Sequence, residues 1–155
     1  LALFETSAIA RYVDEQFSGS SLQPTELQAR AHMNQIISIM DSYGFKAMVW
    51  DVWVEQVRKP ARGEACDKAV VVDGLAKANV ILDSIDRIRS SSTGFAGPAT
   101  TLADLWVAPM LILFDLAPEG RKVVDSRPAW RAWLDEFNRR PSALRTRFPV
   151  EVLPS

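Results

Sequence analysis

Residues 100–106 read TTLADLW, and this stretch predicts the start of the most apolar helix in the chain. The Thr101 hydroxyl can accept a hydrogen bond from the amide of Asp104, whose carboxylate can accept one from the amide of Thr101. This reciprocal pairing is a capping box, and loss of its threonine generally costs about 1 kcal/mol. The helix behind it, as far as Leu116, is apolar on most sides and contains Pro109, which predicts a bend. We therefore expect Thr101 and Asp104 to be structural, with catalysis by Asp104 as the alternative.

Apolar residues recur at helical spacing on both sides of that helix, and no segment alternates with a period of two. Clusters of proline, glycine and serine separate the periodic segments. The sequence therefore predicts an all-α fold. The expected helices are one that ends at 17, then 24–57, 66–89, 101–116, 119–126 and 128–139, followed by a turn at 141–142 and an irregular tail.

The composition favours a soluble protein with an ordinary core and excludes several classes of partner. Hydrophobic residues make up 48% of the chain, and 18 basic and 19 acidic residues give a net charge of −1. Proteins that bind nucleic acid or an anionic membrane usually carry an excess of positive charge, which this composition lacks. Cys66 and His32 are the only soft metal ligands, so we expect neither a disulfide nor a metal site. The longest apolar run, 105–114, is too short to cross a bilayer, and the N-terminus lacks the basic flank of a signal peptide. We expect a cytoplasmic location.

Five stretches, in order, resemble the cytosolic glutathione transferases, most closely the phi or beta-like branches. ETSAIARYV at 5–13 is similar to the signature Glu-Ser-x-Ala-Ile-x-x-Tyr-Leu, which ends that family's thioredoxin-like domain. The other four resemble parts of its all-helical domain: PTELQARAHM at 24–33, ILDSIDRI at 81–88, TTLADL at 100–105 and RPAWRAWLDEFNRRPSALR at 127–145. The resemblance implies a glutathione transferase C-terminal helical bundle in residues 21–155. Residues 1–20 would then be the last helix of a thioredoxin-like domain, in a chain that is partial.

The resemblance also implies an activity, the conjugation of glutathione to an apolar electrophile, with Glu5 and Thr6 as glutathione-binding residues. A helix N-terminus suits the α-carboxylate of the γ-glutamyl group, to which the Thr6 hydroxyl can also donate. The carboxylate of Glu5 can accept from the ligand's ammonium group. Thr6 departs from the family's commoner serine, which keeps the hydroxyl but restricts its rotamers. The alternative is that Thr6 only caps a helix and Glu5 is solvated.

The pocket for the electrophile is expected on the first long helix, where Met40, Tyr43 and Phe45 are the candidates by location. Core packing explains each of them equally well. No residue matches the family's thiol-activating group, so we assign no catalytic residue and expect this chain alone to be inactive. Glutathione would be a co-substrate, no other cofactor is expected, and a homodimer is implied. The alternative function is a non-enzymatic helical interaction module.

Overall fold

The computed structural model describes residues 1–17, 19–89 and 94–147, and within these residues it contains helices and no strand. This confirms the all-α prediction. The tail from residue 148 and part of the expected loop, 90–93, lie outside the described residues. The helices are α1 (Thr6–Gln16), α2 (Leu27–Ile39), η1 (Met40–Arg58), η2 (Pro60–Arg62), α3 (Lys68–Ile88), α4 (Leu102–Leu116), α5 (Pro118–Asp125), α6 (Pro128–Asn138) and α7 (Pro141–Arg145).

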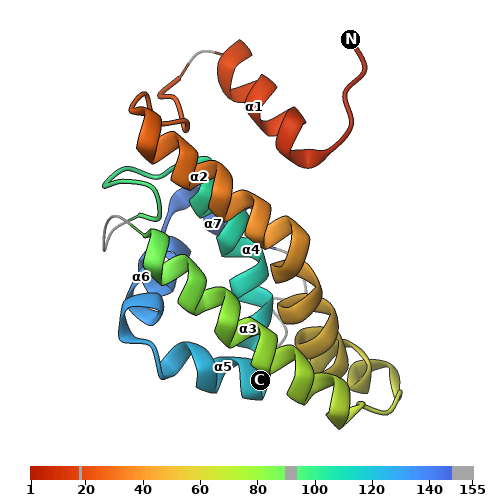
Figure 1. Ribbon diagram of the computed structural model, residues 1–155. Coiled ribbons are helices and arrows are strands. Elements are labelled where there is room, and N and C mark those ends of the chain that lie inside the picture. Colours follow the sequence, from red (N-terminus) through yellow and green to blue (C-terminus); the bar gives the residue numbers. More distant parts are fainter. Residues whose placement is uncertain (18, 90–93, 148–155) are drawn as a thin grey trace.

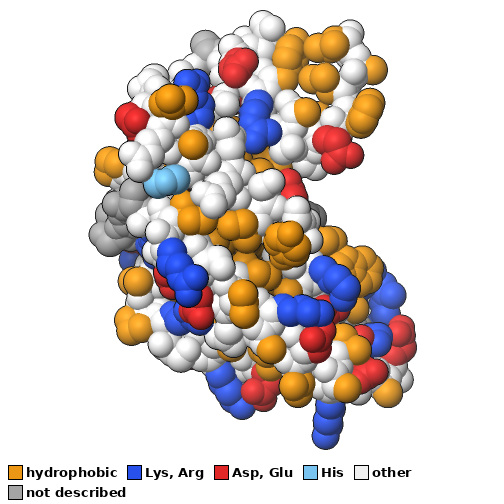
Figure 2. Space-filling model, viewed as in Figure 1, with side chains coloured by type: hydrophobic (Ala, Val, Ile, Leu, Met, Phe, Trp, Pro, Cys, Tyr) orange, Lys and Arg blue, Asp and Glu red, His pale blue; other side chains and the backbone are white. Residues whose placement is uncertain are grey.

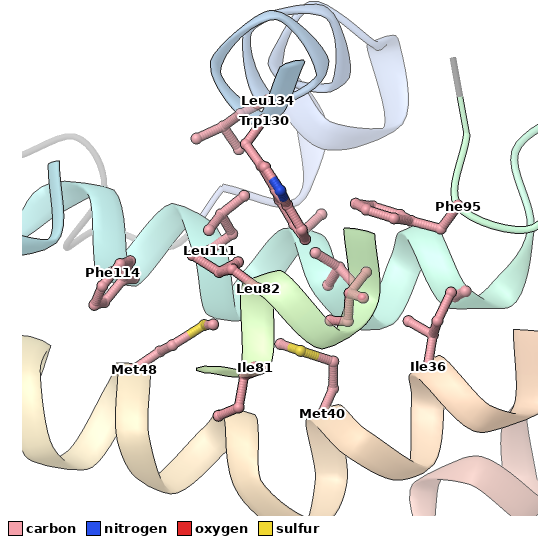
Figure 3. Packing of buried hydrophobic residues seen from close by; sticks show 14 of the residues in the cluster. Ile36, Met40, Met48, Ile81, Leu82, Phe95, Leu111, Phe114, Trp130 and Leu134 are labelled. Carbon is pink, nitrogen blue, oxygen red and sulfur yellow. The ribbon is translucent and has the colours of Figure 1, made fainter. Parts of the chain in front are cut away.

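The central element of the bundle is α4, which packs against α2, η1, α5 and α6 (Figure 1). In Figure 3, Leu111 and Phe114 of α4 gather with Met48 of η1, Leu82 of α3 and Trp130 of α6. All five side chains are fully buried. Helix α4 is apolar on most of its sides because other helices pack against most of them.

The segment expected as one helix over 24–57 is two elements with different hydrogen bonding. Glu26 begins α2, because its carboxylate accepts from the amides of Gln28 and Ala29 at 2.8 and 2.6 Å. These two bonds lower the pKa of the Glu26 carboxyl below its ordinary value. The chain then continues as η1, a π-helix whose bonds run from residue i to i+5. Four of the buried positions in η1 lie four residues apart, namely Met40, Gly44, Met48 and Val52. This interval suits either winding, so the apolar pattern does not distinguish an α-helix from a π-helix.

The start of α4 contains the capping box at Thr101 and Asp104. The Asp104 carboxylate accepts from both the amide and the hydroxyl of Thr101, at 2.8 and 2.9 Å. It also accepts from the amide of Phe95 at 3.3 Å and from the indole of Trp133 at 3.2 Å. This buried carboxylate therefore joins the loop before α4, the start of α4 and helix α6.

Helix α1 lies at the edge of the bundle, beside α2 (Figure 1), and its partly buried Ala10 packs against the core. No residue of α1 is fully buried. Arg11 donates to the Asn34 side chain of α2 at 2.7 Å, and Asp14 accepts from the amide of Leu22 at 2.8 Å. Several large apolar side chains on α1 and in the segments on either side of it remain exposed: Leu1, Leu3, Phe4, Ile9, Tyr12, Val13 and Phe17.

None of the helices in the described part of the chain is both long enough and apolar enough to span a membrane.

Candidate functional site

The residue before α1, Glu5, has an unusual backbone conformation. Its φ is 69° and its ψ is 117°, and among the described residues it is the one non-glycine residue with a positive φ. Such a conformation is unfavourable for a residue with a Cβ and is concentrated at functional sites. The Glu5 carbonyl accepts from the amides of Ala8 and Ile9, at 3.0 and 3.1 Å, while its side chain forms no cap bond with α1. The carboxylate is therefore not used to hold the helix.

Thr6 is the first helical residue of α1 and is exposed. It is not the cap of the helix, because the cap position belongs to Glu5. The amides of Thr6 and Ser7 have no acceptor within α1, because the first amides of a helix lack intrahelical partners. These amides and the positive end of the helix dipole suit an anion. The turn therefore presents one carboxylate, one hydroxyl and two amides together.

A pocket of about 480 Å³ begins at Thr6 and runs between η1 and α4; we call it the Thr6 pocket. Figure 2 shows a notch on the right of the view, between the N-terminal segment above and the bundle below. The walls of the Thr6 pocket are mostly apolar and come from two helices: Phe45 and Val49 from η1, and Leu105, Pro109, Met110 and Leu113 from α4. This arrangement can hold an apolar group beside the turn at Glu5 and Thr6.

Two further residues bring polar groups to the Thr6 pocket, namely Asp41 of η1 and Trp106 of α4. The indole Nε1 of Trp106 donates to Oδ1 of Asp41 at 2.7 Å. This bond holds an exposed carboxylate at an otherwise apolar wall. The sequence reasoning missed both residues. Asp41 lies four positions before Phe45, a spacing that places two side chains near one helix face, whereas nothing local indicates that Trp106 contacts a residue 65 positions away.

The three residues predicted for the electrophile pocket lie in three different places. Met40 has no exposed surface and belongs to the core. Tyr43 is 63% exposed and lines a separate groove between η1 and α3, of about 600 Å³, which we call the Tyr43 groove. Phe45 is 45% exposed and lines the Thr6 pocket. The structure thus brings Phe45 and Thr6 to one pocket and places Met40 and Tyr43 elsewhere.

In the part of the chain that the structure describes, no group of three or more His, Cys, Asp or Glu residues is placed to hold a metal ion. Cys66, which is a free thiol, is half-buried at the approach to α3. It lies far along the chain from the Thr6 pocket and does not line it.

Comparison with known proteins identifies the family. The model of the family described as "Glutathione S-transferase, C-terminal domain" matches residues 52–136, more than half of the chain. Glutathione S-transferase F12 of Arabidopsis thaliana is 32% identical over 142 residues, which cover 90% of this chain and 66% of that protein. Glutathione S-transferase F6 of the same plant is 35% identical over 146 residues, covering 91% of this chain and 67% of that protein.

Solved structures agree with these relatives. Glutathione S-transferase I from mais, in complex with an atrazine glutathione conjugate, is 25% identical with a TM-score of 0.76, over 99% of this chain and 69% of that chain. The chain spans about two thirds of the length of these relatives. The resemblance inferred from the five sequence stretches and the expected helical fold are both confirmed. The chain belongs to the glutathione S-transferase family, whose C-terminal domain it matches over residues 52–136.

Proposed function

We propose that this chain acts as part of a glutathione transferase that conjugates glutathione to an apolar electrophile. The observation that carries the proposal is the turn at Glu5 and Thr6, which opens directly onto an apolar pocket. The mais relative whose structure contains an atrazine glutathione conjugate supports this choice of ligands. The alternative, a helical interaction module, predicts that glutathione does not bind.

In the proposed complex, the α-carboxylate of the γ-glutamyl group lies at the N-terminus of α1. The Thr6 hydroxyl and the free amides donate to it, and the Glu5 carboxylate accepts from the ligand's ammonium group. The electrophile occupies the Thr6 pocket. Thr6 then lies between the electrophile and the bound glutathione. A free thiol has a pKa of about 8.5 and is mostly protonated at neutral pH, so conjugation also needs a group that stabilises the thiolate. We assign that role to no residue of this chain and propose that the chain alone binds ligands without turning them over.

We also propose the division into residues 1–20, which would belong to a thioredoxin-like domain, and residues 21–155, which would form the helical domain. Two observations support it. Helix α1 has no buried residue, and its apolar side chains, including Ile9, Tyr12 and Val13, are exposed although they recur at helical spacing. A helix with that pattern normally packs its apolar face against a neighbour.

Replacing Thr6 with alanine should weaken glutathione binding roughly tenfold, because a hydrogen bond to a charged group is lost. Isothermal titration of glutathione into the chain measures the change. Thr6→Ser is the matched control, because it keeps the hydroxyl and should bind within about twofold of the original chain. Equal affinities for Thr6→Ala and the original chain would exclude Thr6 as a ligand. A chain that binds no glutathione would instead favour the interaction module.

We propose that the Tyr43 groove is where two copies of the chain associate. The groove is lined mostly by apolar atoms of η1 and α3. Tyr43 and Val80 on its walls are 63% and 65% exposed, which is unusual for large apolar side chains that lie together. Lys46 and Lys77 at its edge are each paired with an aspartate of the same chain, so the groove offers little unpaired charge. A homodimer in which each copy covers the other's groove fits this surface.

The substitution Val80→Glu should raise the dissociation constant of this dimer roughly tenfold or more, because it places a charge in a desolvated contact. Light scattering after size-exclusion chromatography, over a range of concentrations, reports the molecular mass. Val72→Glu is the matched control, since Val72 is 67% exposed on the same helix but does not line the groove. A monomeric original chain, or the same mass for all three proteins, would contradict the proposed interface.

A further inference from the structure

The Thr6 pocket contains a carboxylate that is held in place but not neutralised. Oδ1 of Asp41 accepts from the indole of Trp106 at 2.7 Å. Among the described residues, Oδ2 of Asp41 has no hydrogen-bond donor, and no lysine, arginine or histidine forms an ion pair with this carboxylate. The residues that line the pocket, all within the described part of the chain, likewise include no basic side chain. The negative charge is therefore available to a ligand.

The backbone of α4 is also interrupted where this helix lines the pocket. Pro109 lies inside this helix and has no N–H, so the carbonyl of Leu105, four residues earlier, loses its ordinary helical donor. Both Leu105 and Pro109 line the Thr6 pocket. The interruption in the helical hydrogen bonding of α4 therefore lies along the wall of the pocket.

The donors of the pocket are few by comparison. Trp106 has one N–H, and Asp41 already accepts it. The Thr6 hydroxyl lies at the boundary with the turn at α1, where the proposed function assigns it to glutathione. Against the wall formed by η1 and α4, a ligand carboxylate would meet a like charge and no free donor side chain, whereas an ammonium group would meet an acceptor.

We infer that the Thr6 pocket selects ligands in which a protonated amine is attached to an apolar body. The apolar body packs against Phe45, Val49 and Met110, and the ammonium group donates to Asp41. Trp106 is a positioning residue, since its hydrogen bond holds the Asp41 carboxylate in one orientation. The inference rests on the proposed function, in which this pocket receives the electrophile. It adds the class of electrophile that the pocket prefers, one that carries an ammonium group.

Three probes of matched shape test this preference on the 155-residue chain. They are 4-phenylbutylamine, 4-phenyl-1-butanol and 4-phenylbutyrate, titrated without glutathione and followed by calorimetry. The amine should bind roughly tenfold more tightly than the carboxylate, because unit charges about 4 Å apart near a protein surface interact appreciably. The alcohol should lie between the two.

The variant Asp41→Asn keeps an acceptor for Trp106 and removes the charge, so the ratio between amine and carboxylate should fall to about twofold or less. Asp73→Asn is the matched control. It makes the same change in net charge on α3, outside the Thr6 pocket, and should keep the original ratio. One measurement needs no variant: raising the salt concentration to about 0.5 M should weaken binding of the amine and leave binding of the alcohol unchanged.

The inference is overturned if none of the probes binds, if the amine and the carboxylate bind equally, or if Asp41→Asn keeps the preference for the amine. These outcomes are separate from a failure of the proposed function, because glutathione is absent from the titrations and its own binding depends on Glu5 and Thr6. A chain that prefers the amine but does not bind glutathione would support the charge selectivity of the pocket and refute its role in a transferase.

Discussion

Replacing Asp104 with alanine should lower the free energy of unfolding by about 3–5 kcal/mol, the largest loss that we expect from one side chain. Asp104 is 2% exposed and accepts from four donors, namely the amide and hydroxyl of Thr101, the amide of Phe95 and the indole of Trp133. Alanine leaves these donors in a buried region without an acceptor, and each buried unpaired donor costs about 1–3 kcal/mol. Some of that cost is recovered as the loop before α4 rearranges.

Urea unfolding followed by circular dichroism measures this loss, and an unchanged slope would indicate that the unfolded state is not affected. Asp104→Asn keeps one carbonyl acceptor and should show an intermediate loss. Asp135→Ala, at an exposed position of α6, should change the stability by less than about 0.5 kcal/mol. A loss below about 1.5 kcal/mol for Asp104→Ala would equal that of a single ordinary hydrogen bond and would contradict the role of Asp104 as a junction.

The second large effect is expected at Gly120, where alanine should destabilise the fold by about 3 kcal/mol. In most helices the same change is stabilising by about 1 kcal/mol, because alanine is the better helix former. Here a Cβ on Gly120 would lie 2.0 Å from the carbonyl oxygen of Phe114 and 2.9 Å from its carbonyl carbon. The obstacle is backbone rather than a flexible side chain, so α5 cannot keep its position against the end of α4.

Thermal and urea unfolding of Gly120→Ala, beside Lys122→Ala on the exposed side of the same helix, separates packing from helix propensity. Lys122→Ala should change the stability by less than about 0.5 kcal/mol, since its ion pair with Glu119 is on the surface. If Gly120→Ala were neutral or stabilising, the close approach of α5 to Phe114 would not exist in solution.

The part of the fold that could be predicted from the sequence is the part that depends on neighbours along the chain. The capping box at Thr101 spans four residues, and the spacing of apolar residues in α3 and α4 repeats within each helix, so both can be recognised locally. The remaining bonds of Asp104 cannot. Trp133 lies 29 positions away, and nothing in its surroundings indicates which buried acceptor its indole contacts.

The same distinction applies to the candidate site. Glu5 and Thr6 were predicted through a resemblance of nine residues. The positive φ of Glu5 could not be predicted, because glutamate rarely adopts it. Met40 and Phe45 were predicted for one pocket because they lie on one segment. The winding of η1 and its neighbours on two sides, α3 and α4, place Met40 in the core and Phe45 at the Thr6 pocket. Which side of a helix meets which neighbour depends on packing that a single segment does not encode.

The backbone at Glu5 also has a consequence for how this position tolerates exchange. Glycine is the residue that a φ of 69° would favour, yet glycine has no carboxylate to offer a ligand's ammonium group. An alanine or a valine would satisfy neither need. Under the proposed function, folding and recognition therefore make opposite demands on one residue, and a glutamate there would give up some stability to keep a charge next to Thr6.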